Sequence, residues 1–200
     1  MKSLKYLIFS LILLATGSAF ASQITYEVYA NTTLISGTSG YLDFMFNAGN
    51  NSLDATAEVM NFTFPYGGTL VGSPETTGAV SGVLPATVTL GNTSPKNEYF
   101  QGFTFGNLLH FSVRLDGTAL NHPNGSDGSD FGFSMYDASQ NPVLTNDPNG
   151  FAMTVSVTPS GGTEAYYGPN TSAVPEPSTY ALLCISLGVV GYAKRKMGKD

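Results

Sequence analysis

Hydrophobic and polar residues alternate along most of the middle of the chain, the pattern of half-buried β-strands. The clearest case is Leu109–Leu115, where apolar residues alternate with His110, Ser112 and Arg114. Two sets of side chains are each predicted to share one face of a strand: Leu42, Phe44 and Phe46, and Met60, Phe62 and Phe64. Further strands are predicted at residues 24–29, 84–90, 99–105, 131–136, 143–145 and 151–157.

Turn-forming residues separate these segments, as in 48–51, 65–68 and 149–150. Many short strands with such turns predict an all-β domain over residues 22–159, an antiparallel β-sandwich resembling a jelly roll. A closed barrel is the alternative. The glycine-rich residues 160–173 are expected to form a flexible linker.

The first 21 residues are predicted to be a signal peptide. Lys2 and Lys5 precede an apolar run, and Ala19 and Ala21 form a small-residue cleavage site. Export therefore implies the Sec translocon and signal peptidase as partners. An uncleaved membrane helix is the alternative, but the apolar run is short for a span.

Residues 174–200, at the C-terminus, form a segment with a sequence pattern of its own. Val174, Pro175, Glu176 and Pro177 precede an apolar stretch over 180–193, and three basic residues follow it: Lys194, Arg195 and Lys196. A helix of 14 residues spans about 21 Å, less than a hydrocarbon core of ~30 Å. The positive-inside rule nevertheless predicts a short transmembrane helix with the basic end in the cytoplasm. A helix buried in the globular domain is the alternative.

This arrangement of a Pro-Glu-Pro motif, an apolar helix and a basic end resembles the PEP-CTERM sorting domain of Gram-negative bacteria that make exopolysaccharide. The resemblance implies recognition by an exosortase, a membrane transpeptidase thought to cut near Pro-Glu-Pro. Transient membrane anchoring would be followed by attachment to the cell surface or outer envelope, or by release into the matrix. The resemblance covers about the last 27 residues.

The middle of the chain also resembles a group of PEP-CTERM proteins without assigned activity. The segments that carry this second resemblance are 40–44, 46–51, 100–106 and 147–151. It implies no catalytic residues.

Charge narrows the possible partners. Between residues 22 and 174 only Lys96 and Arg114 are basic, against twelve Asp and Glu residues, so this region carries a net charge of −10. Without a basic patch, nucleic-acid binding is not expected. The one cysteine, Cys184, lies in the apolar tail, so the exported domain has neither disulfides nor a thiol nucleophile.

The main candidate ligand site is for calcium. Residues 121–130 concentrate oxygen ligands, and Asp127 with Asp130 and Asp137 are the predicted calcium ligands. The spacing does not match an EF-hand, and a solvated loop is the simpler interpretation. Asp147 to Gly150 is interpreted as an ordinary turn. No other cofactor is expected.

Catalysis is not expected. His110 and His122 have no neighbouring His or Glu in the sequence that would make a zinc motif, and no Gly-x-Ser-x-Gly elbow appears. The carboxylates show no pairing typical of a glycosidase: Glu27, Glu58, Glu75, Glu98 and Glu164. Most aromatic residues are expected in the core, Phe100 among them, and Tyr166 with Tyr167 is the best exposed pair.

The sequence therefore predicts a non-enzymatic structural or adhesive protein of the cell surface or exopolysaccharide matrix. A lectin-like carbohydrate-binding module, with or without calcium, is the alternative. A polysaccharide-degrading enzyme is the third hypothesis.

Overall fold

The computed structural model describes residues 23–121 and 127–175, and within them the protein is almost entirely β-structure. One six-stranded sheet, sheet A, has the order β12-β1-β8-β3-β6-β5. Its strands are Thr171–Pro175, Gln23–Asn31, Leu108–Gly117, Ala55–Thr63, Val88–Gly91 and Val80–Gly82. Sheet B, also six-stranded, has the order β11-β10-β9-β2-β7-β4. Its strands are Thr163–Tyr167, Phe151–Val157, Ser129–Asp137, Ser39–Ala48, Glu98–Thr104 and Thr69–Thr77.

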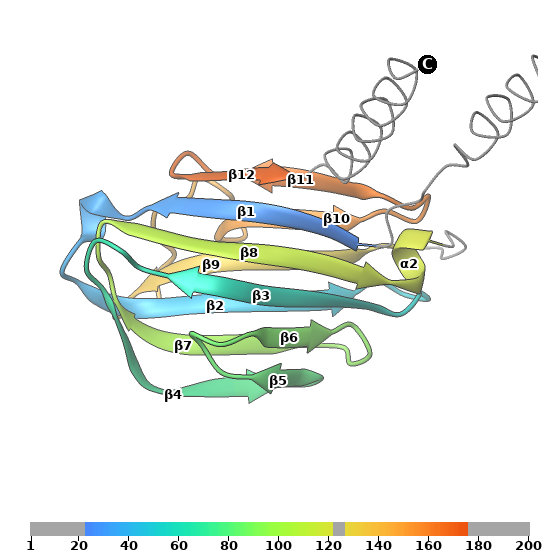
Figure 1. The fold of residues 1–200 in the computed structure, drawn as a ribbon, viewed down its shortest axis with the longest axis horizontal. Coiled ribbons are helices and arrows are strands. Elements are labelled where there is room, and N and C mark those ends of the chain that lie inside the picture. Colours follow the sequence, from blue (N-terminus) through green and yellow to red (C-terminus); the bar gives the residue numbers. More distant parts are fainter. Residues whose placement is uncertain (1–22, 122–126, 176–200) are drawn as a thin grey trace, which may run out of the picture.

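The two sheets form two layers, with β11 and β12 at one edge and β4 and β5 at the other (Figure 1). All strand pairs are antiparallel, and β1 pairs with β8, β2 with β7 and β3 with β6. This nested pairing winds the first eight strands over both sheets, as expected of a jelly roll. Within residues 23–121 and 127–175, helical structure is limited to one short turn, η1 at Thr33–Ile35, and one short helix, α2 at Thr118–Asn121.

The core lies between the sheets and is rich in phenylalanine. Phe44 of sheet B and Phe111 of sheet A meet edge to face, with ring centroids 5.3 Å apart. Phe133 stacks on Phe44 from the neighbouring strand at 5.1 Å. The predicted inward faces of β2 and β8 are confirmed, because Leu42, Phe44, Phe46 and the four apolar residues of 109–115 are fully buried.

The predicted face of β3 is wrong in part. Phe62 is buried, but Met60 is only half-buried and does not belong to the core. Asn61 has a φ of 55°, and the β3–β8 register shifts between Met60 and Thr63. Such an irregularity changes which residues face inward. Ala55, Ala57 and Val59 therefore fill the core before it.

The predicted flexible linker is also wrong. Within residues 160–173, β11 pairs with β10, and β12 pairs with β1 along its full length. Thr171 is 8% exposed, so this segment is part of the folded domain. The strand predicted at 143–145 is absent, since residue 142 makes only an isolated bridge and Leu144 has a φ of 58°. Of the strand predicted at 84–90, only residues 88–90 form a strand, as part of β6.

Candidate functional site

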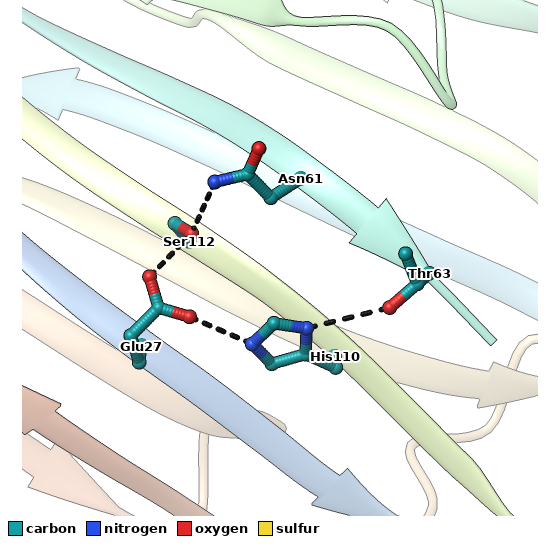
Figure 2. A network of polar contacts seen from close by, with 5 residues as sticks. All are labelled: Glu27, Asn61, Thr63, His110 and Ser112. Atoms are coloured by element: carbon teal, nitrogen blue, oxygen red, sulfur yellow. Dashed lines mark hydrogen bonds and ion pairs between the residues drawn. The ribbon is translucent and has the colours of Figure 1, made fainter. Parts of the chain in front are cut away.

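A polar network on the outer face of sheet A brings together the kinds of residue that catalytic sites use. Glu27 of β1 contacts His110 and Ser112, which are neighbours on the outer face of β8 (Figure 2). The Glu27 Oε2–His110 Nε2 distance is 2.7 Å, and the Ser112 hydroxyl donates to Glu27 Oε1 at 2.5 Å. Asn61 donates to Ser112 Oγ at 3.0 Å, and His110 Nδ1 lies 3.3 Å from Thr63 Oγ1.

The connectivity of this network differs from that of a nucleophilic triad. In a triad the serine hydroxyl contacts the histidine, which in turn contacts the carboxylate. Here the carboxylate of Glu27 lies between the other two groups. Ser112 is 1% exposed, so a substrate has no access to its hydroxyl. The network therefore serves to satisfy a buried hydroxyl and to tie three strands together.

Tyr29 extends this face toward β12. Its ring stacks on His110 with centroids 4.5 Å apart, and it is 42% exposed. It lines a shallow hollow of about 260 Å³ together with Asn31, Leu108 and the segment 169–172.

The outer face of sheet B carries the larger hollow, a groove of about 360 Å³. Its floor comes from the middle strands β2, β9 and β10, and the turn at 147–149 contributes to its wall. The groove lining combines carboxylates, amides, hydroxyls and one aromatic ring. The residues whose side chains matter for binding are Asn47, Asp130, Asp147, Asn149, Phe151, Thr154 and Ser156.

The ring of Phe151 packs against the backbone of β9 at Gly132. A Cβ atom placed on Gly132 would lie 2.4 Å from Phe151 Cε1, closer than real contacts allow. Glycine at this position therefore lets the ring lie flat against the sheet, where it forms part of the groove floor.

The turn in the groove wall is held in place by its own side chain. Asp147 Oδ1 accepts the N–H of Asn149 at 2.8 Å, and the Gly150 N–H donates to the Asp147 carbonyl at 3.0 Å. The Thr145 hydroxyl donates to the Phe151 carbonyl at 2.5 Å. On the groove floor, Ser156 Oγ donates to Asp130 Oδ1 of the neighbouring strand at 2.5 Å. The wall is thus preformed.

Aromatic side chains cross the same face of sheet B, one from each of five neighbouring strands. Tyr41, Phe100 and Tyr136 alternate with buried core residues, which places them on the outer face. Phe151 has the same parity as the buried Met153 and faces outward because the β9–β10 register shifts between the two. Tyr166 lies opposite Thr154, which lines the groove. In strand order they are Phe100, Tyr41, Tyr136, Phe151 and Tyr166. Tyr41 stacks on Phe100 at 4.7 Å, and Phe100 lies 6.2 Å from Tyr136. Phe100 is thus on the outer face, not in the core as the sequence predicted.

A buried carboxylate lies beside these rings. Asp43 is 3% exposed and lies opposite Phe100 on one side and Ser134 on the other. Burial raises the pKa of Asp43 to about 7, with Glu98 adding to the rise and Lys96 opposing it. Its Oδ1 atom makes no hydrogen bond within the described chain. The Ser134 hydroxyl is likewise buried and makes no hydrogen bond within the described residues.

The predicted calcium ligands do not form one site. Asp130 and Asp137 lie at opposite ends of β9, about 23 Å apart at ~3.3 Å per residue. Asp137 instead accepts the Ser139 and Asn141 N–H groups, and the Asn141 N–H lowers the pKa of Asp137 most. Asp127 is exposed beside Gly49. Among residues 23–121 and 127–175, no three His, Cys, Asp or Glu side chains cluster to hold a metal.

Several predicted site residues lie outside the described residues. These are the cleavage-site residues Ala19 and Ala21, the motif residues Glu176 and Pro177, His122, and the basic residues Lys194, Arg195 and Lys196. The helix predicted over 180–193 lies there too. In the described ranges no helix is long and apolar enough to cross a membrane. Val174 and Pro175 are described, and they end β12.

Sequence reasoning did not find the contacts that build either face. Glu27 and His110 are 83 residues apart, and only the pairing of β1 with β8 places them together. The alternation along β8 showed that His110 and Ser112 share a face, but the sequence did not identify the strand beside them. The sheet B groove likewise combines segments about 100 residues apart.

Comparison with known proteins identifies one part of the chain. The family model of the PEP-CTERM protein-sorting motif matches residues 173–196. No curated protein and no solved structure matches the chain. The match confirms the sorting signal, whereas the resemblance of the middle region has no such support.

The chain is thus a protein with a PEP-CTERM sorting signal. Such a signal implies export and sorting by an exosortase at the membrane of a Gram-negative bacterium. The match begins at residue 173, within β12, so the sorting motif overlaps the last strand of the folded domain.

Proposed function

We propose that this exported protein acts at the cell surface or in the exopolysaccharide matrix as a structural or adhesive component, without catalysis. The Sec translocon and signal peptidase deliver it across the membrane, and the exosortase removes its tail. The folded domain of sheets A and B is then the part that functions.

The observation that carries this proposal is the overlap of the sorting motif with β12. Ala173, Val174 and Pro175 pair with Val28, Glu27 and Tyr26 of β1. Because the motif starts inside the sheet, the domain has no spacer before the signal that sorts it. An exosortase that cuts near Pro-Glu-Pro and joins the new C-terminus to a surface acceptor would leave the domain directly at that surface, as a structural or adhesive component requires.

The surface charge supports the same role. Between residues 22 and 174 the chain has twelve acidic residues and two basic ones, and this excess of negative charge repels nucleic acids and anionic polymers. Both basic side chains are engaged by carboxylates, Lys96 by Glu98 at 2.8 Å and Arg114 by Glu58. The surface therefore offers carboxylates together with uncharged polar and aromatic groups for contact with a matrix, while both basic side chains are already paired.

The test compares cells that lack the gene with cells that carry it. We expect weaker attachment and a less cohesive matrix in the deletion strain, restored by the wild-type gene. The exported protein is also incubated with a panel of polysaccharides, and reducing ends are measured. Hydrolysis at enzyme-like rates, or unchanged attachment in the deletion strain, would refute the proposal.

A second candidate function, lectin-like carbohydrate binding, is favoured by the sheet B groove. Sugar sites combine an aromatic surface with several hydrogen-bonding side chains, and the groove contains both. The two functions are compatible, because an adhesive protein needs a surface that contacts its matrix.

A further inference from the structure

We propose that the groove on the outer face of sheet B is a binding site for an uncharged saccharide, with Phe151 as the stacking surface and Asn149 and Thr154 as the main hydrogen-bonding groups. This inference rests on the adhesive function proposed above and gives that function a contact surface.

The groove offers hydrogen-bonding side chains to a ligand. The side chains of Asn149 and Thr154 line the groove and make no hydrogen bond within the described chain. Asp147 and Asp130 each use one carboxylate oxygen, Oδ1, on the protein itself, which leaves Oδ2 facing solvent or ligand. Carboxylates accept hydrogen bonds from the adjacent hydroxyls of a sugar ring, and amides both donate hydrogen bonds to them and accept hydrogen bonds from them.

Phe151 gives the groove an aromatic floor. The Phe151 ring lies against Gly132 on one side and lines the groove. It is half-buried, and Tyr136 and Tyr166 flank it in the strand order of sheet B. Aromatic rings offer a large contact area at little cost in conformational entropy. A flat saccharide face fits this surface better than a compact ion does.

The charge of the groove selects among saccharides. The groove is lined by Asp130 and Asp147 and by no Lys, Arg or His. Uronic acids and sulfated or phosphorylated sugars would be repelled there. Two carboxylates would also attract a basic peptide. Such a peptide would not use the Phe151 ring or the amide and hydroxyl groups of the groove.

The wall of the groove is preorganised for binding. The turn at 147–149 is fixed by hydrogen bonds to Asp147 and by the Thr145–Phe151 contact. A rigid wall lowers the entropic cost of binding, which matters for weakly bound ligands such as sugars. Asp147 in the wall and Asp130 on the floor each bind protein groups through Oδ1, so the site needs no calcium to keep its shape.

The experiment uses the protein exported by the producing cells, in its native form. An array of uncharged hexasaccharides of glucose, galactose and mannose serves as the probe, alongside matched uronic-acid oligosaccharides and a lysine-rich peptide. Affinity for each positive probe is then measured by calorimetry with and without EDTA. The variants are Phe151→Ala and the double variant Asn149→Ala with Thr154→Val. The controls are Tyr29→Ala and Thr56→Val, which change the outer face of sheet A.

We expect binding of at least one uncharged hexasaccharide, unaffected by EDTA. Both groove variants should weaken it by about tenfold or more, the loss expected for one stacking ring or two hydrogen bonds. The controls should bind like the wild type. Circular dichroism shows whether each variant remains folded, and the Asn149→Ala, Thr154→Val pair keeps the test valid if Phe151→Ala does not fold.

Three results would overturn the inference: no binding to any uncharged probe, binding that the groove variants leave unchanged, or binding of the lysine-rich peptide alone. The proposed function has a separate readout, since cell attachment is measured in the same variants. Loss of saccharide binding with normal attachment would refute this use of the groove but not the adhesive role.

Discussion

Val174 of the sorting motif lies opposite Glu27 in the antiparallel pair formed by β12 and β1. On its other side, Glu27 pairs with Ser112 of β8, and its carboxylate accepts a hydrogen bond from the Ser112 hydroxyl. The start of the sorting motif is therefore one strand away from the polar network of sheet A. Folding of the domain and presentation of the motif involve the same strand.

The first prediction concerns β12. A chain that ends at Gly168 should be less stable than one that ends at Pro175, because it loses β12 and leaves the edge of β1 unpaired. Loss of about four ladder hydrogen bonds predicts a decrease of roughly 2–6 kcal/mol in the free energy of unfolding. Urea unfolding of residues 22–168 and 22–175 measures the difference. Equal stability would mean that 169–175 is a linker after all.

The second prediction concerns Glu27. Replacing Glu27 by Ala leaves the buried Ser112 hydroxyl without its acceptor, at a cost of about 1–3 kcal/mol. Glu27→Gln keeps an acceptor and should cost less. In the Ser112→Ala background, the Glu27→Ala effect should shrink, because no hydroxyl is left unsatisfied. Denaturant unfolding of the single and double variants tests this. Additive losses would show that the two side chains are not coupled.

The third prediction concerns the pH dependence that Asp43 causes. Its pKa is about 7 in the folded protein and close to 3.8 when unfolded. Between these values the folded state binds more protons than the unfolded state, so its contribution to stability falls as pH rises. The contribution is complete below about pH 4 and absent above about pH 7, with an upper limit of roughly 4 kcal/mol.

Asp43→Asn removes this ionisation. We expect the variant to be more stable than the wild type at pH 8, with a smaller decrease in stability between pH 4 and pH 7. Asp54→Asn, at an exposed position, is the matched control and should follow the wild type. Thermal unfolding across this range is the measurement. A wild type whose stability profile matches that of Asp43→Asn would contradict the prediction.

The fourth prediction concerns Gly132. Because an added Cβ would lie 2.4 Å from the Phe151 ring, Gly132→Ala must displace the ring or the strand. We expect a loss of roughly 1–3 kcal/mol, as for other overpacked sites. Gly37→Ala is a poor comparison because its φ is 81°, whereas Gly91→Ala meets nothing closer than 3.4 Å and serves as the control. Equal effects of the two substitutions would count against the packing described here.

The sequence predicted well those strands in which apolar and polar residues alternate without interruption. β8 falls where expected, since its inward residues are apolar and its outward residues are mostly polar. β10 also falls at the predicted residues 151–157, but a register shift turns Phe151 away from the face of Met153 and Val155. The register of β3 was not predictable, because one residue, Asn61, changes the facing of those that follow it.

The strands at the edges were missed for a different physical reason. β4, β11 and β12 carry few buried side chains and are held mainly by backbone pairing. Small polar residues and glycine give these strands a composition that resembles that of a linker. The groove was missed because its residues come together only through sheet pairing, although the turn at Asp147 was recognised. The sorting signal was predicted because it is local in sequence.

Mass spectrometry of the protein recovered from outside the cells tests the central claim most directly, since it determines both processed ends. The account predicts a chain that begins at Ser22, keeps β12, and has lost Lys194–Asp200 together with the apolar segment before it. Recovery of the intact chain from the cytosol, or of an exported chain that still ends in Lys194–Asp200, would contradict it.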